Sequence, residues 1–244
     1  LKMAERLSKK HNSPLLIHLA EAQSEVDFVR KNKNMRPIEY ADKIGILSNR
    51  TIAAHVIHAN QSEIELLEKR GVGVAHNPES NMKLAAGVAP VPSMIKKNVR
   101  LGLGTDGPAS NNDLSLWEEM DSAAKLHKIF SKDPKAASAK EMFELATIGG
   151  ARALHMEEKI GSLETGKLAD IVLVDIDSLH HTPLYNVYSH LVYTVKSSDV
   201  STVIVNGRVL MLKRTLVTLN ENRVKKEANE YRKKIIASLE QPKQ

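Results

Sequence analysis

The stretch Pro14-Leu-Leu-Ile-His-Leu-Ala-Glu21 decides the fold class. It is a short apolar run whose second half contains His18 and Glu21, two side chains that can bind a metal or transfer a proton. Three runs of the same kind follow, at residues 52–58, 72–77 and 100–105. Helical patterns separate the runs. This alternation of strand and helix predicts an α/β domain built on a parallel sheet.

The predicted helices precede, separate and follow these runs. They lie at residues 1–10, 24–32, 37–46, 62–70, 91–98, 114–130 and 138–155. The last one opens with Ser138-Ala-Lys-Glu141, which has the spacing of a capping box and predicts where that helix starts. Four strand–helix units fit either an open sheet or half of a closed eight-stranded barrel, and the pattern alone favours neither.

Beyond residue 160 the pattern changes to short strands. Strand candidates lie at residues 169–175, 202–205 and 208–212. Asn206-Gly207 separates the last two and indicates a β-hairpin. We therefore expect two domains, an α/β domain at residues 1–158 and a small β domain with a closing helix at residues 159–244.

The formal charge of +6 is concentrated near the C-terminus, where residues 208–244 contain ten Lys or Arg and four Glu. Apolar residues at helical spacing accompany this charge, namely Val224, Ala228, Tyr231, Ile235 and Leu239. We interpret the charge as the solvated face of a packed helix. A nucleic-acid surface is disfavoured, since aromatic residues make up only 4% of the chain.

Composition excludes several other classes of protein. No apolar run is long enough to span a membrane, and the first residues lack the apolar core of a signal peptide. Cysteine is absent, which excludes disulfides and thiolate metal ligands. We expect a cytoplasmic protein that binds neither nucleic acid nor a membrane. Because the chain begins at Leu1, we also expect its natural start to lie upstream.

Polar residues gather where the four predicted strands end. They are His18 and Glu21, His55 and His58, His76 and Asn77, and Asp106. Since the carboxyl ends of parallel strands meet at one edge of a sheet, we expect one polar cluster there. Imidazole and carboxylate are ligands that Zn²⁺ or Fe²⁺ binds when thiolates are missing.

Each of these residues also has an ordinary structural interpretation. Asp106 precedes a glycine and could form a turn, and Glu21 could lie at a helix N-terminus. His58 and His76 are the weaker members of the cluster. Recurrence at four equivalent positions nevertheless favours a metal or acid–base site. The remaining histidines of the later helices and the β domain are interpreted as structural or solvated, namely His127, His155, His180, His181 and His190.

Four consecutive motifs resemble the amidohydrolase superfamily. They are His18-Leu-Ala-Glu21, Ala-Ala-His55-Val-Ile-His58, Ala-His76-Asn77-Pro-Glu-Ser80-Asn81 and Leu-Gly-Thr-Asp106-Gly-Pro-Ala-Ser110. The similarity continues through Gly166-Lys-Leu-Ala-Asp170 and covers nearly the whole chain. Within the superfamily the chain is most similar to 5-methylthioadenosine/S-adenosylhomocysteine deaminases. The resemblance implies the C-terminal half, strands five to eight, of a (β/α)8 TIM-type barrel, with part of a small β-sandwich.

The resemblance also implies roles for particular residues. His18 and Asp106 match ligands of one divalent metal, zinc, with iron as the alternative. Glu21, His55 and Asp106 match catalytic residues, which also contact the substrate together with Asn77 and Ser110. Glu21 would protonate the purine ring, Asp106 would carry a proton from water to ammonia, and His55 would stabilise the developing oxygen charge.

The implied function is metal-dependent hydrolytic deamination of a small purine nucleoside, 5-methylthioadenosine or S-adenosylhomocysteine, with a homo-oligomer as one option. Two departures from the family pattern matter. Ala22 stands where Thr is common, and the chain lacks the His-x-His pair of the family's first strand. We therefore expect part of a deaminase that is inactive alone. The alternatives are a guanine or cytosine deaminase, a triazine chlorohydrolase, or a non-catalytic half-barrel.

Overall fold

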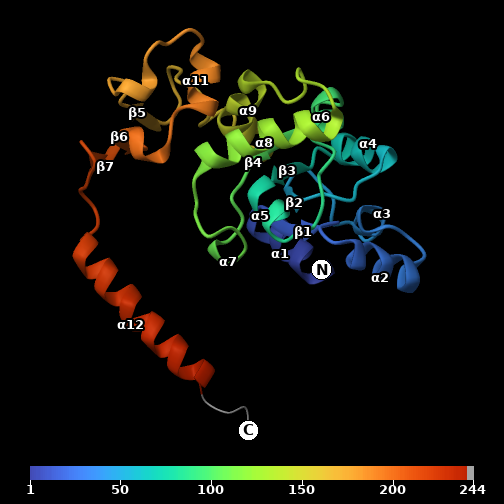
Figure 1. Ribbon diagram of the computed structural model, residues 1–244. Coiled ribbons are helices and arrows are strands. Elements are labelled where there is room, and N and C mark those ends of the chain that lie inside the picture. The colour runs from blue at the N-terminus through green and yellow to red at the C-terminus, as the bar shows by residue number, and fades with distance from the viewer. Residues whose placement is uncertain (241–244) are drawn as a thin grey trace. The chain divides into compact units, whose positions relative to one another are not determined.

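The computed structural model describes residues 1–240, and its first sheet is parallel (Figure 1). The strands lie in chain order, as β1 (Leu15–Leu19), β2 (Thr51–His55), β3 (Gly73–His76) and β4 (Arg100–Leu103). Leu15 pairs with Thr51, and Gly73 pairs with Arg100. All four predicted runs form strands, and each strand ends one to three residues before its run does.

Helices alternate with these strands as the sequence predicted. They are α1 (Lys2–His11), α2 (Gln23–Lys33), α3 (Pro37–Lys43), α4 (Gln61–Arg70), α6 (Val91–Lys96) and α8 (Leu116–Ser131). Asn60 and Glu63 form a capping box at the start of α4, and Gly71 ends it with a φ of 64°. These local signals fix the helix between two strands of the sheet.

Two short helices follow strand ends and were not predicted. They are α5 (Pro78–Lys83), directly after β3, and α7 (Pro108–Asn111), after β4. Each begins with a proline, whose fixed φ suits the first helical position. Both helices carry side chains that reach the candidate site described below.

The prediction of one helix at residues 138–155 is wrong, because the segment forms α9 (Ala139–Ala146) and α10 (Ile148–Ala153). The Ser138–Glu141 capping box is confirmed. The helix breaks at Thr147, whose φ of −123° and ψ of −103° are not helical. Beyond the break α10 lies directly against the sheet, since a Cβ on Gly102 would come within 2.6 Å of the Cα of Gly150.

The core lies between the parallel sheet and these helices. Its buried side chains come from the strands and from α4, α6 and α8, and include Ala53, Val74, Leu101, Ile64, Leu67, Met94, Met120 and Ala123. Removing a side chain such as Leu67 would cost about 2–5 kcal/mol, as for other buried leucines. This packing holds the strand ends of the sheet in place.

The second sheet is antiparallel and contains the predicted strands. Its order is β5 (Ile171–Val174), β6 (Val200–Val205), β7 (Arg208–Leu212) and β8 (Thr215–Leu216). Asn206 and Gly207 have φ values of 49° and 73°, as a two-residue type I′ turn requires, so the predicted hairpin is confirmed.

The predicted closing helix is present as α12 (Glu221–Glu240), but the prediction that it packs is wrong. None of its residues is buried, and Tyr231 and Ile235 are 64% and 58% exposed. Helical spacing of apolar residues predicts that a helix forms, but it does not predict whether another part of the chain packs against that helix.

Contacts divide the described chain into two compact units. One comprises residues 1–167 and 177–197, including α11 (Val187–Tyr193) and a short 3-10 turn (Leu179–His181). The other comprises residues 168–176 and 198–240, including a second 3-10 turn (Ser197–Asp199) at its edge. The expected domains at 1–158 and 159–244 stay a prediction. Within residues 1–240, no helix combines the length and apolarity needed to cross a bilayer.

Candidate functional site

Strained backbone marks the carboxyl edge of the parallel sheet. Ala20, His55 and Asp106 follow or end β1, β2 and β4, and their φ values are 52°, 72° and 56°. This left-handed region costs an ordinary residue about 1–2 kcal/mol. Such strain gathers at functional sites, where the surrounding packing maintains it. At these strand ends the fold therefore maintains a backbone conformation that costs free energy.

His18, Glu21 and His55 lie together at this edge. His55 Nε2 is 3.2 Å from His18 Nδ1 and 3.7 Å from a carboxylate oxygen of Glu21. The same Glu21 oxygen is 3.5 Å from His18 Nδ1. His55 is fully buried, whereas the His18 side chain is 59% exposed. The cluster is thus anchored in the core on one side and open on the other.

Asp106 reaches the same cluster from β4. Its Oδ1 lies 3.8 Å from His18 Nε2, and its Oδ2 accepts hydrogen bonds from Ser80, at 2.9 Å, and from Ser110. Burial of the carboxyl opposes its charge, but the bonds from Ser110 and Ser80 outweigh this and hold the pKa of Asp106 below its ordinary value. Asp106 is therefore a carboxylate near neutral pH.

Asn81 orients the ring of His55. The Asn81 side-chain carbonyl lies 2.8 Å from His55 Nδ1, so that nitrogen donates a proton to it. In the neutral ring, the lone pair is then on Nε2, the nitrogen that points to His18 and Glu21. Metal-binding histidines are commonly fixed in this way by a bond to their other nitrogen.

These residues fit a divalent metal ion. One ligand atom from each of His18, Glu21 and His55 lies within 4.8 Å of the others, and Asp106 adds a carboxylate beside His18. Nitrogen and oxygen donors of this kind suit zinc or iron. The expected ligands, His18 and Asp106, are thus brought together. Their roles stay predictions.

The other expected site residues lie near the cluster to different degrees. Ser110 bonds to Asp106 directly. Asn77 is buried at the end of β3 and packs against β4, since a Cβ on Gly104 would lie 2.5 Å from its Oδ1. His58 follows β2 and is partly buried. Their contacts with a substrate stay predictions.

His76 belongs to a buried pair with His127 of α8. Their Nε2 atoms are 3.0 Å apart, and both side chains are fully buried. Burial holds the pKa of His76 well below its ordinary value and lowers the pKa of His127 to about 4. Both rings are therefore neutral near pH 7 and join β3 to α8.

Sequence reasoning did not assign Ser80 or Asn81 to the site. Both lie in α5, and the helical turn brings them back toward Asp106 and His55. Pro78 after a strand end was the available signal, because it favours the first turn of a helix. Their partners lie 26 residues away in the sequence, which no local pattern reveals.

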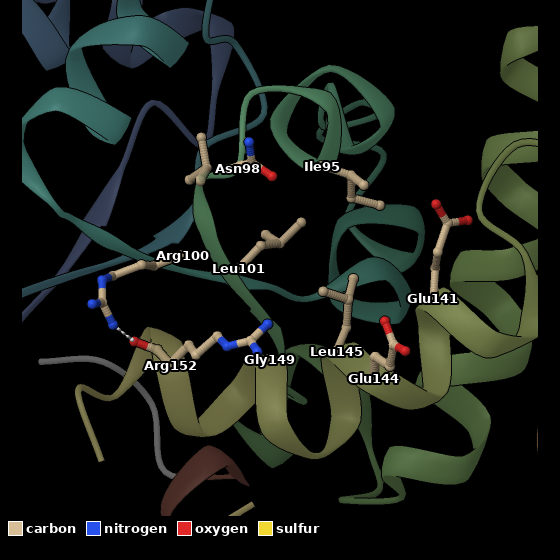
Figure 2. Close-up of a pocket in the computed structure, with 10 residues that line it drawn as sticks. Ile95, Asn98, Arg100, Leu101, Glu141, Glu144, Leu145, Gly149 and Arg152 are labelled. Carbon is tan, nitrogen blue, oxygen red and sulfur yellow. Dashed lines mark hydrogen bonds between the residues drawn. The ribbon is translucent and has the colours of Figure 1, made fainter. Parts of the chain in front are cut away.

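A cavity of about 250 Å³ lies elsewhere, between β4, the end of α6 and α9–α10 (Figure 2). Ile95, Leu101 and Leu145 line it together with Arg152, whose backbone carbonyl accepts a bond from Arg100. Arg100 begins β4, whereas the cluster follows the end of that strand. None of the expected site residues lines this cavity.

Comparison with known proteins shows the family of this chain. The model of the amidohydrolase family matches residues 1–210. The chain belongs to this family. The resemblance seen in the four motifs is thereby confirmed.

Individual members of the amidohydrolase family are similar to this chain in sequence or in structure. The chain is 47% identical over 218 residues to a 5-methylthioadenosine/S-adenosylhomocysteine deaminase of Syntrophobacter fumaroxidans, covering 89% of the chain and 50% of the relative. The crystal structure of a zinc-bound adenosine deaminase from Xanthomonas campestris matches with a TM-score of 0.94 and 36% identity, over 97% of this chain and 54% of that one. A zinc complex of the atrazine chlorohydrolase TrzN from Arthrobacter aurescens TC1 matches with a TM-score of 0.85 and 26% identity, over 92% and 50%. The chain spans about half the length of the curated relatives it matches.

Proposed function

We propose that the chain is the C-terminal half of a metal-dependent deaminase that converts 5-methylthioadenosine or S-adenosylhomocysteine to the inosine analogue and ammonia. The convergence of His18, Glu21, His55 and Asp106 at one sheet edge carries this proposal. The name of the Syntrophobacter relative supports the choice of substrate.

The strand order supports a half-barrel. Each parallel strand pairs with the next one in the chain, from β1 to β4, as in a (β/α)8 barrel. A doubly wound sheet instead reverses direction at a switch point. In our proposal β1–β4 are the last four barrel strands, and the antiparallel strands β5–β8 are part of a small β-sandwich.

Three residues of the cluster handle protons and charge in the proposed reaction. Glu21 donates a proton to a ring nitrogen, so that the adjacent carbon accepts the attack of water. Asp106, kept ionised by its serine partners, takes the proton of that water and delivers it to the departing amine. His55, whose Nδ1 donates to Asn81, presents Nε2 as an acceptor to the attacking water and to the hydroxyl group that this water becomes.

A metal held by His18 and Asp106 would supply the acidity that makes water a nucleophile near neutral pH. Zinc is the proposed ion, because two structural relatives were crystallised with it, and iron is the alternative. Asn77 and Ser110 are proposed to contact the nucleoside. The expected cytoplasmic location, the homo-oligomer and the absence of nucleic-acid and membrane partners remain predictions.

The test supplies the other half of the enzyme. This chain would be fused behind the corresponding N-terminal half of the Syntrophobacter deaminase, loaded with zinc, and assayed for ammonia release from both nucleosides. Glu21→Gln should lower kcat at least 100-fold, since the proton donor is lost. Asp27→Asn, which removes an exposed carboxylate from α2, is the matched control. No turnover of any aminopurine by the unsubstituted fusion would refute the proposal.

A triazine chlorohydrolase is the second candidate, favoured by the structural match to TrzN. It shares the metal chemistry and differs in the leaving group. Assaying the same fusion with atrazine, guanine and cytosine separates these activities. A non-catalytic half-barrel would show neither turnover nor metal binding in any fusion.

A further inference from the structure

Glu119 of α8 lies outside the cluster, yet its two oxygens bond to two segments that lead into it. The side chain is fully buried. Its Oε1 accepts a bond of 2.6 Å from the Asn111 side chain, and its Oε2 accepts one of 3.1 Å from the backbone N–H of Glu79. One carboxyl group therefore joins α8 to both α7 and α5.

Through α5, Glu119 acts on the residues that hold the cluster. Glu79 lies in the first turn of α5, and the two residues after it are Ser80 and Asn81. Ser80 bonds to Asp106, and Asn81 bonds to His55. A shift of the Glu79 backbone would therefore move a hydrogen-bond partner of each of these two groups.

Through α7, Glu119 acts on Asp106 by a second route. The Asn111 side chain that donates to Glu119 also donates to the backbone carbonyl of Thr105, at 2.9 Å. Thr105 directly precedes Asp106, whose φ of 56° is strained. Asn111 thus connects the strained turn at Asp106 to the buried Glu119 side chain of α8.

We propose that Glu119 is a positioning residue, which holds α5 and α7 together so that Asp106 and His55 keep their places at the strand ends. This inference rests on the proposed function for the meaning of the cluster. It assigns to Glu119 no contact with substrate or metal.

The presence of an acidic side chain at this buried position supports the proposal. Neighbouring buried positions of α8 hold Met120, Ala123 and Ala124, so an apolar side chain would satisfy packing alone. The charged groups that act on Glu119 are Glu79 and Asp113, both acidic, and burial raises its pKa to about 8. Burying such a group is costly unless its hydrogen bonds are needed.

Glu119→Gln tests the proposal because it keeps the shape and changes one oxygen to an N–H2 group. That group must face either the Asn111 amide donor or the Glu79 N–H, so one bond is lost. In the zinc-loaded fusion we expect kcat to fall about 10–100-fold while KM changes less than about threefold, as expected when reacting groups are misplaced. Asn111→Ala should have the same effect through the second route. The double variant should be little worse than either, because both act through one network.

Hydrogen exchange supplies a readout that needs no activity. In the 244-residue chain itself, Glu119→Gln should speed exchange at residues 79–81 and 105–111 about tenfold, and leave the amides of β2 unchanged. Asp121→Asn is the matched control, because that carboxylate on the same helix pairs only with Lys125 among the described contacts. Exchange that rises equally in β2 and at both segments, or kcat within twofold in both single variants, would overturn the proposal. An inactive unsubstituted fusion would refute the proposed function, while exchange would still decide the role of Glu119.

Discussion

At the scale of the residue, the site depends on hydrogen bonds that set the state of each group before any substrate arrives. His55 has its lone pair on Nε2 because Asn81 accepts from Nδ1. Asp106 stays ionised because Ser80 and Ser110 donate to it. The strand ends place these side chains, and their hydrogen-bond partners set the orientation of the ring and the charge of the carboxylate.

Replacing Asn81 tests this dependence. Asn81→Ala leaves His55 Nδ1 without its acceptor, so the ring can rotate or change tautomer. We expect kcat to fall about 10–100-fold, the usual effect of removing such a partner, while zinc affinity, which the proposal assigns to His18 and Asp106, changes little. Steady-state kinetics and zinc titration of the fusion measure both quantities. Asn32→Ala, in which only an exposed bond within α2 is lost, should change neither quantity.

The ionisation of Glu119 should make the free energy of unfolding fall as the pH rises. Burial raises its pKa from 4.5 to about 8, so the folded chain holds a proton that the unfolded chain releases. This contribution to stability is present below pH 4.5 and is lost as the pH rises to about 8, by up to about 1.4 kcal/mol per unit. Glu119→Gln cannot ionise. Its free energy of urea unfolding should therefore fall less between pH 5 and pH 8 than that of the unsubstituted chain, and parallel curves would contradict the assignment.

Four residues of the cluster could be predicted, while their supports could not. His18 and His55 lie in the last two residues of β1 and β2, Glu21 and Asp106 follow the ends of β1 and β4, and the ends of parallel strands meet at one edge. Asn81 bonds to His55, 26 residues before it, and Glu119 bonds to Asn111, 8 residues before it. These bonds depend on the directions of short helices, which only the folded chain defines.

At the scale of the element, local signals predicted the helices and strands well but not what they pack against. The capping box at Ser138 set the start of α9, but no local signal predicted the break at Thr147, beyond which Gly150 lies in close contact with Gly102 of β4. In α12 the apolar spacing predicted the helix and wrongly predicted its burial. Contacts between elements supply information that spacing lacks.

The contact between β3 and α8 should make the chain sensitive to acid. Burial lowers the pKa of His127 from 6.5 to about 4 and that of His76 well below 6.5, so both are neutral when folded. Their contribution to stability is present above pH 6.5 and is lost as the pH falls toward 4, by up to about 1.4 kcal/mol per unit for each group.

His127→Gln should weaken this acid sensitivity. Urea unfolding at pH 7, 6 and 5 should show a shallower decline for the variant, since one of the two groups no longer binds a proton on unfolding. The exposed His11→Gln is the control and should leave the slope unchanged. An equal slope in His127→Gln would mean that the pair does not determine the acid response.

At the scale of the whole molecule, the parallel sheet ends at β1 on one side and β4 on the other within the described residues. An unpaired strand edge favours association with another chain. Because the chain covers about half of its relatives, the edges fit the proposal that further strands complete a barrel. Sequence pattern alone could not distinguish this from an open sheet, since both use the same strand–helix units.

Metal binding should therefore differ between the chain and the fusion. The 244 residues offer His18 and Asp106 as the expected ligands, whereas a catalytic zinc usually has at least three from protein. We expect less than one zinc per chain after dialysis and negligible ammonia release, and one zinc with turnover in the fusion. Metal analysis by mass spectrometry and an ammonia assay measure both. Tight, stoichiometric zinc in the chain alone would show that the ligands are assigned wrongly.

The order of strands in the parallel sheet has a consequence for inheritance. All four residues of the cluster lie between positions 18 and 106, on strands that follow one another without interruption by the other sheet. A single recombination event upstream of β1 would thus transfer all four residues of the cluster together from one family member to another. Exchange of this segment would keep the spacing of the four residues intact, because no part of the antiparallel sheet lies between them.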